Sequence, residues 1–277
     1  MPPAYAQLNE FELCFGLDFF LKAGMDATDP LFTSIIKKLL NRLNKRNGIG
    51  FSSHFPLIDA DDTATGLYAA SLAGYPVSPE PLLAFFNGRC FHAYQGERTP
   101  SISVNLHALA ALNLFKNQSP AINEIIDKSY LWIKHNLDRL DNQIILHDKW
   151  HTSCFYGTSR AVFCLYDFDR ELAQNCINWL TGQQRRNGGW GAGDESTYEE
   201  TAYVVLALCF WGRKGYPINN QQLTDAFDFL NEADALRRKE SLWIDKVLYC
   251  PTLIRESAIL AARYALSNRL SSDPAVN

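Results

Sequence analysis

Three aspartates, Asp59, Asp61 and Asp62, stand within four positions of the chain, directly behind the apolar stretch 55–58. Carboxyl groups so close together cannot all ionise in a buried pocket, because like charges repel and burial disfavours the charged form. One carboxylic acid can then stay protonated near neutral pH, although a free aspartic acid has a pKa of roughly 3.9. Such a neutral acid can donate its proton to a substrate.

The same residues also fit an ordinary helix start. An apolar-periodic run follows from Thr63, and Gly74 and Pro76 mark its end, which predicts a helix. Aspartate accepts hydrogen bonds from the free N–H groups of a first helical turn and suits the positive end of the helix dipole. That dipole favours the charged carboxylate, so burial must dominate if one carboxyl group is to stay protonated. Helix capping and acid catalysis are therefore alternative interpretations of the triplet.

The composition narrows the class of protein. The chain has 277 residues, of which 47% are hydrophobic and 13% aromatic, enough for a sizeable core rich in rings. The net charge of −4 and the pI of about 5.9 argue against nucleic acid as a partner. The seven cysteines are odd in number and include no Cys-x-x-Cys pair. We therefore expect reduced thiols and a cytoplasmic protein.

The first 46 residues contain two predicted amphipathic helices. Apolar residues recur at helical spacing over 10–23 and 30–43, and Asn47-Gly48 closes the second helix. No basic residue precedes the first apolar run, and acidic residues interrupt it. We therefore expect neither a signal peptide nor a membrane span.

The chain repeats itself. The segment 47–76 recurs as the segment 187–217, and the tripeptide Asp62-Thr63-Ala64 matches Glu200-Thr201-Ala202. A further helix is predicted after each copy, over 78–86 and 219–230. We predict about eleven helices in all, with 90–94 and 144–146 as the candidates for short extended pieces.

Repeated helical hairpins predict an all-α fold, a single α/α barrel. We assign one domain to residues 1–277, with N-terminal helices in 1–46 and the barrel region in 47–277. The helices rich in small residues should lie inside and the loops at one rim. The acidic triplet would then lie at the mouth of the barrel or in its cavity.

The triplet resembles the motif of a known family. Asp59-Ala60-Asp61-Asp62-Thr63-Ala64 matches the D-x-D-D-T-A motif of class II terpene cyclases, which include squalene-hopene cyclases and copalyl diphosphate synthases. The family's QW repeat is resembled by Trp179, Gln184, Gly188 and Trp190. Further segments resemble bacterial diterpene cyclases in the same order: 97–101 with Asn105, 148–151, 199–203, and 242–244 with Lys246 and Tyr249.

The resemblance implies a proton-initiated reaction. In the family the middle aspartate donates the proton, which here is Asp61, while Asp59 and Asp62 hold and tune it. Asn105 resembles a family position that hydrogen-bonds the acid. The implied substrate is geranylgeranyl diphosphate, which would close to a bicyclic labdane- or halimadane-type diphosphate with its diphosphate retained. Magnesium (Mg²⁺) is implied as the ion that bridges the diphosphate.

Carbocations need stabilising without a nucleophile, and aromatic faces provide this through cation–π attraction. The candidate substrate-binding residues are Phe51, Lys149, Trp150, Tyr156, Trp190 and Trp243. Phe51 and Trp243 stand out by their place in the matched segments, and Lys149 resembles a position associated with the diphosphate. The alternatives are core packing for the rings and a solvated surface charge for the lysine.

Other chemistries find less support in the sequence. His107 and His151 lack the spacing of zinc ligands, so we predict no metal site in the protein. The glycine-rich run 188–193 lacks the spacing and the lysine of a phosphate-binding loop. The chain also has no D-D-x-x-D, the motif by which class I cyclases ionise a diphosphate.

The chain departs from the family in its extent. Bacterial class II cyclases have two barrel domains, named β and γ, with the cavity between them, and the matched segments account for a β domain alone. We expect a γ-like partner protein or a second copy of the chain to cover the opening, because water would quench the cation. Two alternative functions stay open. One is cyclisation of farnesyl diphosphate to a drimane-type product, and the other is a non-catalytic β-domain subunit of a cyclase complex.

Overall fold

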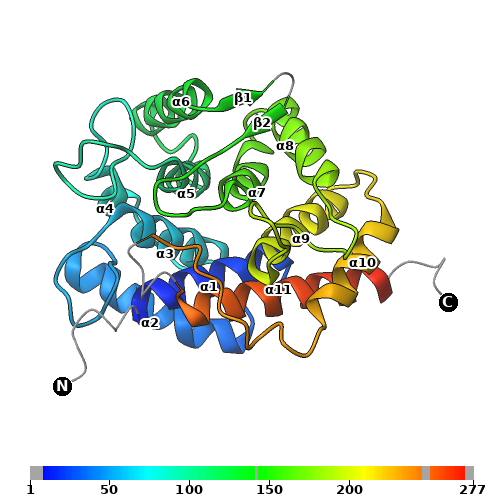
Figure 1. Cartoon of the computed structure of the whole chain (residues 1–277). Helices are drawn as coiled ribbons and strands as arrows, with labels where there is room; N and C mark the ends of the chain where they lie inside the picture. Colours follow the sequence, from blue (N-terminus) through cyan, green and yellow to red (C-terminus); the bar gives the residue numbers. More distant parts are fainter. Residues whose placement is uncertain (1–8, 141–142, 245–249, 272–277) are drawn as a thin grey trace. The chain divides into compact units, whose positions relative to one another are not determined.

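The computed structural model describes residues 9–140, 143–244 and 250–271, and these residues are predominantly helical (Figure 1). They contain eleven helices and one two-stranded sheet. The chain divides into two compact units. Unit 1 comprises residues 1–21 and 25–137, and unit 2 comprises residues 22–24 and 138–277. The predicted all-α class is confirmed.

Unit 1 holds the helices up to the middle of the chain. Their bounds are α1 Asn9–Ala23, whose last two residues belong to unit 2, α2 Pro30–Arg46, α3 Ala60–Leu72, α4 Glu80–Leu83, α5 Ile102–Asn113 and α6 Pro120–His135. Helix α3 packs against α5 and α2, and α5 packs against α6. The contact between α3 and α5 matters most for the site, because it joins two helices whose N-termini carry polar residues.

Unit 2 contains the sheet and the remaining helices. Its elements are β1 Asp138–Leu140, β2 Gln143–Ile145, α7 Cys154–Leu165, α8 Arg170–Gly182, α9 Tyr198–Arg213, α10 Asn220–Leu230 and α11 Thr252–Ser271. The strands are antiparallel, with Ile144 opposite Arg139. Helix α7 packs against both α8 and α9, and α9 lies along α11 (Figure 1).

Buried and amphipathic helices alternate along the chain. Helices α3, α5, α7 and α9 are buried around most of their circumference, while α2, α6, α8 and α10 bury one face. A helix that is apolar all round needs neighbours on every side, whereas an amphipathic helix covers a core with one stripe. Within each unit, amphipathic helices therefore cover helices that are buried on most sides.

Side-chain caps fix where most helices begin. The residue before each of eight helices accepts a backbone N–H of the first turn through its side chain. These residues are Asp29, Asp59, Ser101, Ser119, Ser153, Asp169, Thr197 and Asn219. Each cap satisfies a donor that the helix cannot pair internally and contributes about 1 kcal/mol.

The segment 78–86 differs from its prediction as a full helix. Only α4, four residues long, is helical there, and the chain then turns back at Asn87, so that Phe86 pairs with Phe91. The Asn87 side chain accepts the N–H groups of Arg89 and Cys90, and Gly88 has a φ of 92°. A local side-chain turn has therefore displaced the end of the helix.

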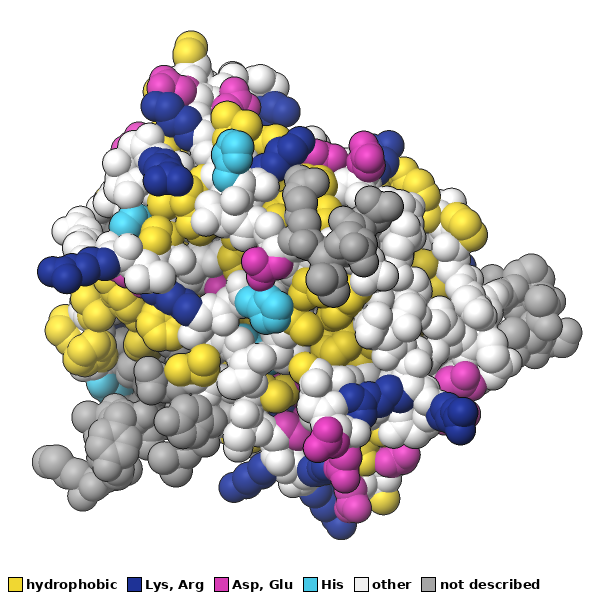
Figure 2. All heavy atoms as spheres, turned by 45° about the horizontal axis from the view of Figure 1, so that its top comes forward, with side chains coloured by type: hydrophobic (Ala, Val, Ile, Leu, Met, Phe, Trp, Pro, Cys, Tyr) yellow, Lys and Arg dark blue, Asp and Glu magenta, His cyan; other side chains and the backbone are white. Residues whose placement is uncertain are grey.

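The surface carries no large field of one sign in the view of Figure 2. Lysine and arginine side chains are scattered among acidic and hydrophobic ones on this face, which agrees with the net charge of −4. Within the described ranges, no helix combines the length and the apolar character that crossing a bilayer requires.

Candidate active site

The acidic triplet forms the N-terminus of α3. Asp59 is the N-cap, in extended backbone, and its carboxylate accepts the N–H of Asp62 at 2.8 Å. The capping interpretation therefore holds for Asp59. Asp62 is completely buried, while the carboxyl group of Asp61 keeps 16% of its surface exposed. Of the three, Asp61 is the carboxyl group that a substrate can best approach.

The approach segment is tied to this helix start. The N–H of Asp59 donates to the carbonyl of Ile49 at 2.9 Å, and the Thr63 hydroxyl accepts the N–H of Ile49 at 2.9 Å. A Cβ at Gly50 would lie 2.0 Å from the carbonyl oxygen of Leu57, so the backbone at Gly50 and at Leu57 can approach this closely only because Gly50 has no side chain. The backbone that leads to Phe51 is thereby fixed beside the motif.

Asp61 makes one short contact, with His107 of α5. Its Oδ1 lies 2.5 Å from the Nδ1 of His107, and the histidine is 9% exposed. The pair forms because α3 packs against α5. No hydrogen-bond partner for the Nε2 of His107 lies among the described residues. The arrangement is a largely buried carboxyl–imidazole pair, in which a proton can be held and moved.

Aromatic rings extend from this pair. The Phe15 ring meets the His107 ring edge-on at 5.5 Å, and Phe11 lies 4.5 Å from Phe15. Phe51 then lies 5.9 Å from Phe11 and 6.1 Å from Tyr94. Phe51, the only one of these rings predicted from the sequence, therefore belongs to a continuous row of rings that reaches the histidine of the acid pair.

The three carboxyl groups act electrostatically on their neighbours. Burial raises the pKa of the Tyr94 phenol, and the charges of Asp59, Asp62 and Asp61 raise it further. The pKa of the Cys14 thiol is raised by burial and then by Asp62 and Asp59, and its sulfur lies 3.7 Å from the carbonyl oxygen of Asp62. The carboxyl groups that are ionised thus make this site favourable for positive charge. A developing cation there would be stabilised.

Asn105 does not bind the acid as expected. Its side-chain amide donates to the carbonyls of Phe91 and Ser101 at 2.9 and 2.8 Å, and its oxygen accepts the N–H of Phe91 at 2.8 Å. Both amide hydrogens are thereby used, and none is left for Asp61. The structure corrects this prediction: Asn105 holds the segment around Phe91, and His107 contacts the acid.

The other predicted substrate-binding residues lie in unit 2. The ammonium group of Lys149 lies 4.7 Å above the Trp150 ring, and both residues are partly exposed. Tyr156 and Trp243 are almost fully buried, with their rings 5.1 Å apart. Trp190 is completely buried, and its indole N–H donates to the carbonyl of Leu180 at 2.7 Å. The structure gives Trp190 a packing role, and Lys149 and Trp150 keep surface for a ligand.

Two residues of the segment that resembles a QW repeat, Trp179 and Gln184, contact their neighbours in unit 2. The amide of Gln184 donates to the carbonyls of Gly188 and Gln222, each at 2.9 Å. Trp179 is buried beside Phe155, with the two rings 5.0 Å apart. Gln184 and Trp179 therefore fasten helix ends together within unit 2.

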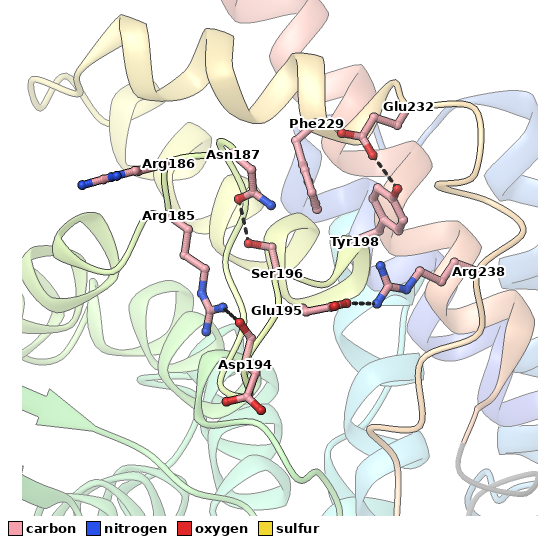
Figure 3. Close-up of a pocket in the computed structure, with 10 residues that line it drawn as sticks. All are labelled: Arg185, Arg186, Asn187, Asp194, Glu195, Ser196, Tyr198, Phe229, Glu232 and Arg238. Carbon is pink, nitrogen blue, oxygen red and sulfur yellow. Dashed lines mark hydrogen bonds and ion pairs between the residues drawn. The ribbon is translucent and has the colours of Figure 1, made fainter.

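A surface pocket of about 480 Å³ lies beside the start of α9 (Figure 3). Arg185 donates to the carbonyl of Gly191, and Arg238 pairs with Glu195 at 2.5 Å. Tyr198 donates its hydroxyl to Glu232 at 2.6 Å. The lining of this pocket is polar, and its side chains are largely paired with one another. Such a lining is unsuited to an isoprenoid chain. This pocket is therefore not the candidate active site.

Helix α9 begins in the same way as α3. Thr197 caps it, and Thr201 accepts the N–H of Trp190 at 2.9 Å, as Thr63 accepts that of Ile49. The repeat thus holds in three dimensions. Glu199 occupies in unit 2 the helix position that Asp61 occupies in unit 1.

A second carboxylate, Glu240, also binds the start of α9. It accepts the N–H groups of Tyr198 and Glu199 at 2.7 and 2.9 Å. Burial raises the pKa of Glu240 from 4.5 to about 7, the nearby Glu199 charge raises it, and the two N–H groups and Arg255 oppose the rise. Because each tenfold change in proton affinity is worth about 1.4 kcal/mol, ionising Glu240 costs the folded state up to ~3 kcal/mol.

Glu240 should therefore make stability depend on pH. Its contribution is fully present below about pH 4.5 and is lost as the pH rises through about 7, so the free energy of unfolding falls over that window. We expect Glu240→Gln, which cannot ionise, to flatten the dependence. Urea unfolding followed by circular dichroism at several pH values measures this. Parallel curves for the variant and the parent chain would contradict the prediction.

The chain is similar to known proteins in sequence and in structure. No family model matches the chain. A copalyl diphosphate synthase from Streptomyces anulatus is 36% identical over 219 residues, which are 76% of this chain and 39% of that protein. A type B diterpene cyclase from Mycobacterium tuberculosis is 28% identical over 94% of this chain and 52% of its own length.

The fold has a close counterpart among solved structures. An ent-copalyl diphosphate synthase from Streptomyces platensis superposes with a TM-score of 0.81 at 28% identity, over 94% of this chain and 51% of that one. The chain therefore spans about half the length of the relatives it matches, or less. The comparisons of sequence and of structure both find copalyl diphosphate synthases from Streptomyces among the similar proteins.

Proposed function

We propose that this chain, which belongs to the bacterial class II diterpene cyclase family, cyclises a prenyl diphosphate by protonating an alkene. The chain spans about half the length of its relatives. Asp61 is the proton donor. Its proton adds to the terminal double bond, and the tertiary carbocation that results is attacked by the next double bond along the folded chain. Loss of a proton from carbon ends the reaction, so the product is an isomer of the substrate.

The observation that carries this proposal is the 2.5 Å contact between Asp61 and His107. When His107 is protonated, its Nδ1–H donates to Oδ1 of Asp61, and Oδ2 carries the proton that is transferred. After the transfer the imidazolium stabilises the carboxylate that remains, which lowers the barrier to giving the proton up. A helix cap needs only Asp59, so the pair is unexplained if the chain is a non-catalytic subunit.

The substrate favoured by this proposal is geranylgeranyl diphosphate. Relatives carry the names copalyl diphosphate synthase and type B diterpene cyclase, and diterpenes have twenty carbons. The product would be a bicyclic labdane- or halimadane-type diphosphate, with the diphosphate retained. The shorter farnesyl diphosphate, giving a drimane-type product, is the alternative substrate.

Aromatic rings are proposed to stabilise the carbocation, and a lysine to bind the diphosphate. Phe51 and its neighbours Phe11 and Tyr94 belong to the row of rings that reaches His107, and each ring can contribute ~0.5 to 2 kcal/mol of cation–π attraction. Lys149, beside Trp150, is the candidate for the diphosphate end. The rings are assigned by their place in this row, and Lys149 by its residue type and its partly exposed surface.

Magnesium enters the proposal only with the substrate. Among the residues that the structure describes, no group of three His, Cys, Asp or Glu side chains is placed to hold a metal ion. The donor set for a resident ion is thus absent from that part of the chain. We assign Mg²⁺ to the diphosphate, whose charge it neutralises.

The proposal also includes a cover for the site. A carbocation must be kept from water, and the relatives have about as much chain again beyond the part matched here. We propose that a γ-like partner protein or a second copy of this chain supplies that cover.

Incubation with prenyl diphosphates tests the proposal. The full chain is given magnesium and geranylgeranyl or farnesyl diphosphate, alone and with a γ-like partner, and phosphatase treatment precedes mass analysis. We expect a bicyclic twenty-carbon alcohol in place of geranylgeraniol. Recovery of the linear alcohols alone under every condition would refute the function, and a fifteen-carbon bicycle alone would move the assignment to farnesyl diphosphate.

A further inference from the structure

Glu199, the counterpart of Asp61 in the second repeat, is a buried carboxylate that the mechanism does not use. It is 0% exposed. Its Oε1 accepts the indole N–H of Trp243 at 2.7 Å and also the hydroxyl of Tyr203. No hydrogen-bond partner of Oε2 lies among the described residues. A buried carboxylate with one unused oxygen is costly, so its retention calls for a specific role.

Trp243, which donates to Glu199, belongs to residues 240–244, here called the strap. The strap pairs with residues 150–152. The N–H of Thr152 donates to the carbonyl of Leu242 at 2.8 Å, and the N–H of Ile244 donates to the carbonyl of Trp150 at 2.9 Å. His151 and Trp243 are opposite each other in this ladder. Where the strap lies therefore decides where Trp150 lies.

Two carboxylates fasten the strap to α9 in opposite directions. Glu199 reaches from the helix to Trp243 of the strap, and Glu240 reaches from the strap to the N–H groups of Tyr198 and Glu199. Such reciprocal bonds resemble the two halves of a capping box, in which each partner satisfies the other.

A packed set of rings reinforces this attachment. His151 stacks on Tyr156 with centroids 4.6 Å apart, and the Trp243 ring meets both, at 5.0 Å from His151 and 5.1 Å from Tyr156. The indole N–H of Trp243 is the polar handle of this set, and Glu199 is its acceptor. Losing the acceptor leaves a buried donor unpaired, which costs about 1 to 3 kcal/mol.

We propose that Glu199 is a positioning residue, which, through Trp243 and the strap, holds Lys149 and Trp150 in place for the diphosphate end of the substrate. The role of Lys149 and Trp150 at the diphosphate rests on the proposed function, whereas the attachment of the strap does not. The same helix position thus serves as the acid in unit 1 and as a fastening in unit 2. Only an acceptor is required of Glu199, so the neutral Glu199→Gln should serve as well.

Hydrogen exchange tests the attachment without any turnover. In Glu199→Ala we expect amide exchange about 10-fold or more faster in peptides covering 148–153 and 240–244, with α10 unchanged. Trp243→Phe, which keeps a ring but removes the N–H, should behave alike, and Glu199→Gln should match the parent chain. Glu232→Gln is the control, because Glu232 is exposed and contacts Tyr198 but not the strap.

Kinetics test the positioning. With geranylgeranyl diphosphate we expect Glu199→Ala to raise KM about 10-fold while kcat stays within about threefold, and Glu199→Gln to restore KM. Unchanged exchange in a folded Glu199→Ala or Trp243→Phe variant would overturn the fastening, and faster exchange with an unchanged KM would overturn the positioning. A loss of kcat in Glu199→Gln would show that the charge itself is used. If the parent chain turns over no prenyl diphosphate, the proposed function fails, and the exchange result still decides the fastening.

Discussion

The Asp61→Asn variant is expected to lose cyclisation of geranylgeranyl diphosphate by at least about 10³-fold. General acids contribute about 10² to 10⁴ to a rate, and here the proton also starts the reaction, so no other step can replace it. Asparagine has the same shape but no acidic proton. Because Asp61 makes its short contact with His107 alone and does not cap the helix, the fold should persist. Product yield by mass analysis, with circular dichroism for folding, measures the effect.

Asp59→Asn is the matched control for this variant. It removes another carboxylate of the same triplet, but asparagine caps a helix as well as aspartate does, so the bond to the N–H of Asp62 is kept. We expect activity well above that of Asp61→Asn. A folded Asp61→Asn protein with the parental product yield would eliminate Asp61 as the donor.

The second large effect is expected at His107. Replacing it with phenylalanine keeps a ring against Phe15 but removes the nitrogen that contacts Asp61. The carboxylate left after proton transfer then lacks its partner in a largely buried site, so kcat should fall about 10²-fold. KM should change little, because His107 acts on the acid. Initial rates across a range of substrate concentrations separate the two constants.

An exposed pair provides the control for His107. His147 lies 2.9 Å from Asp138, and both side chains are more than 60% exposed. Removing the imidazole there should leave the rate unchanged. Should His107→Phe retain the parental kcat, the carboxyl–imidazole pair would have no part in the reaction.

Much of the fold was predictable because its signals are local. The spacing of apolar residues predicted α1 and α2, and polar caps predicted the starts of α3 and α10. The repeat between 47–76 and 187–217 predicted that α3 and α9 begin alike, which the structure confirms. The short α4 was missed, because the turn at Asn87 depends on contacts that apolar spacing does not encode.

The acid's partner was missed for a geometric reason. His107 is 46 residues from Asp61, and only the packing of α3 on α5 brings them together. Asn105 was predicted instead. Asn105 and His107 are two positions apart, which corresponds to about 200° around the helix axis. Their side chains therefore leave α5 on different faces. The signal that could have identified His107 is a titratable side chain on a helix that is otherwise largely apolar, two residues beyond Asn105.

In unit 2 the sequence does not distinguish a substrate-binding ring from a ring of the core. The sequence predicts Trp190 and Trp243 as substrate-binding rings, whereas in the structure both are buried and donate their indole N–H groups within unit 2. Residue type alone cannot separate a ring that faces a ligand from one that packs in a core. Lys246 and Tyr249 lie outside the described residues.

Deuterium incorporation tests the central claim most directly. In deuterium oxide the carboxyl proton of Asp61 exchanges, so the group that reaches the terminal alkene carbon is a deuteron, and it remains there as a C–D bond. We predict a bicyclic product one mass unit heavier than the product formed in ordinary water, with a single deuterium at the protonated carbon. A cyclic product formed in deuterium oxide without deuterium would contradict proton-initiated cyclisation.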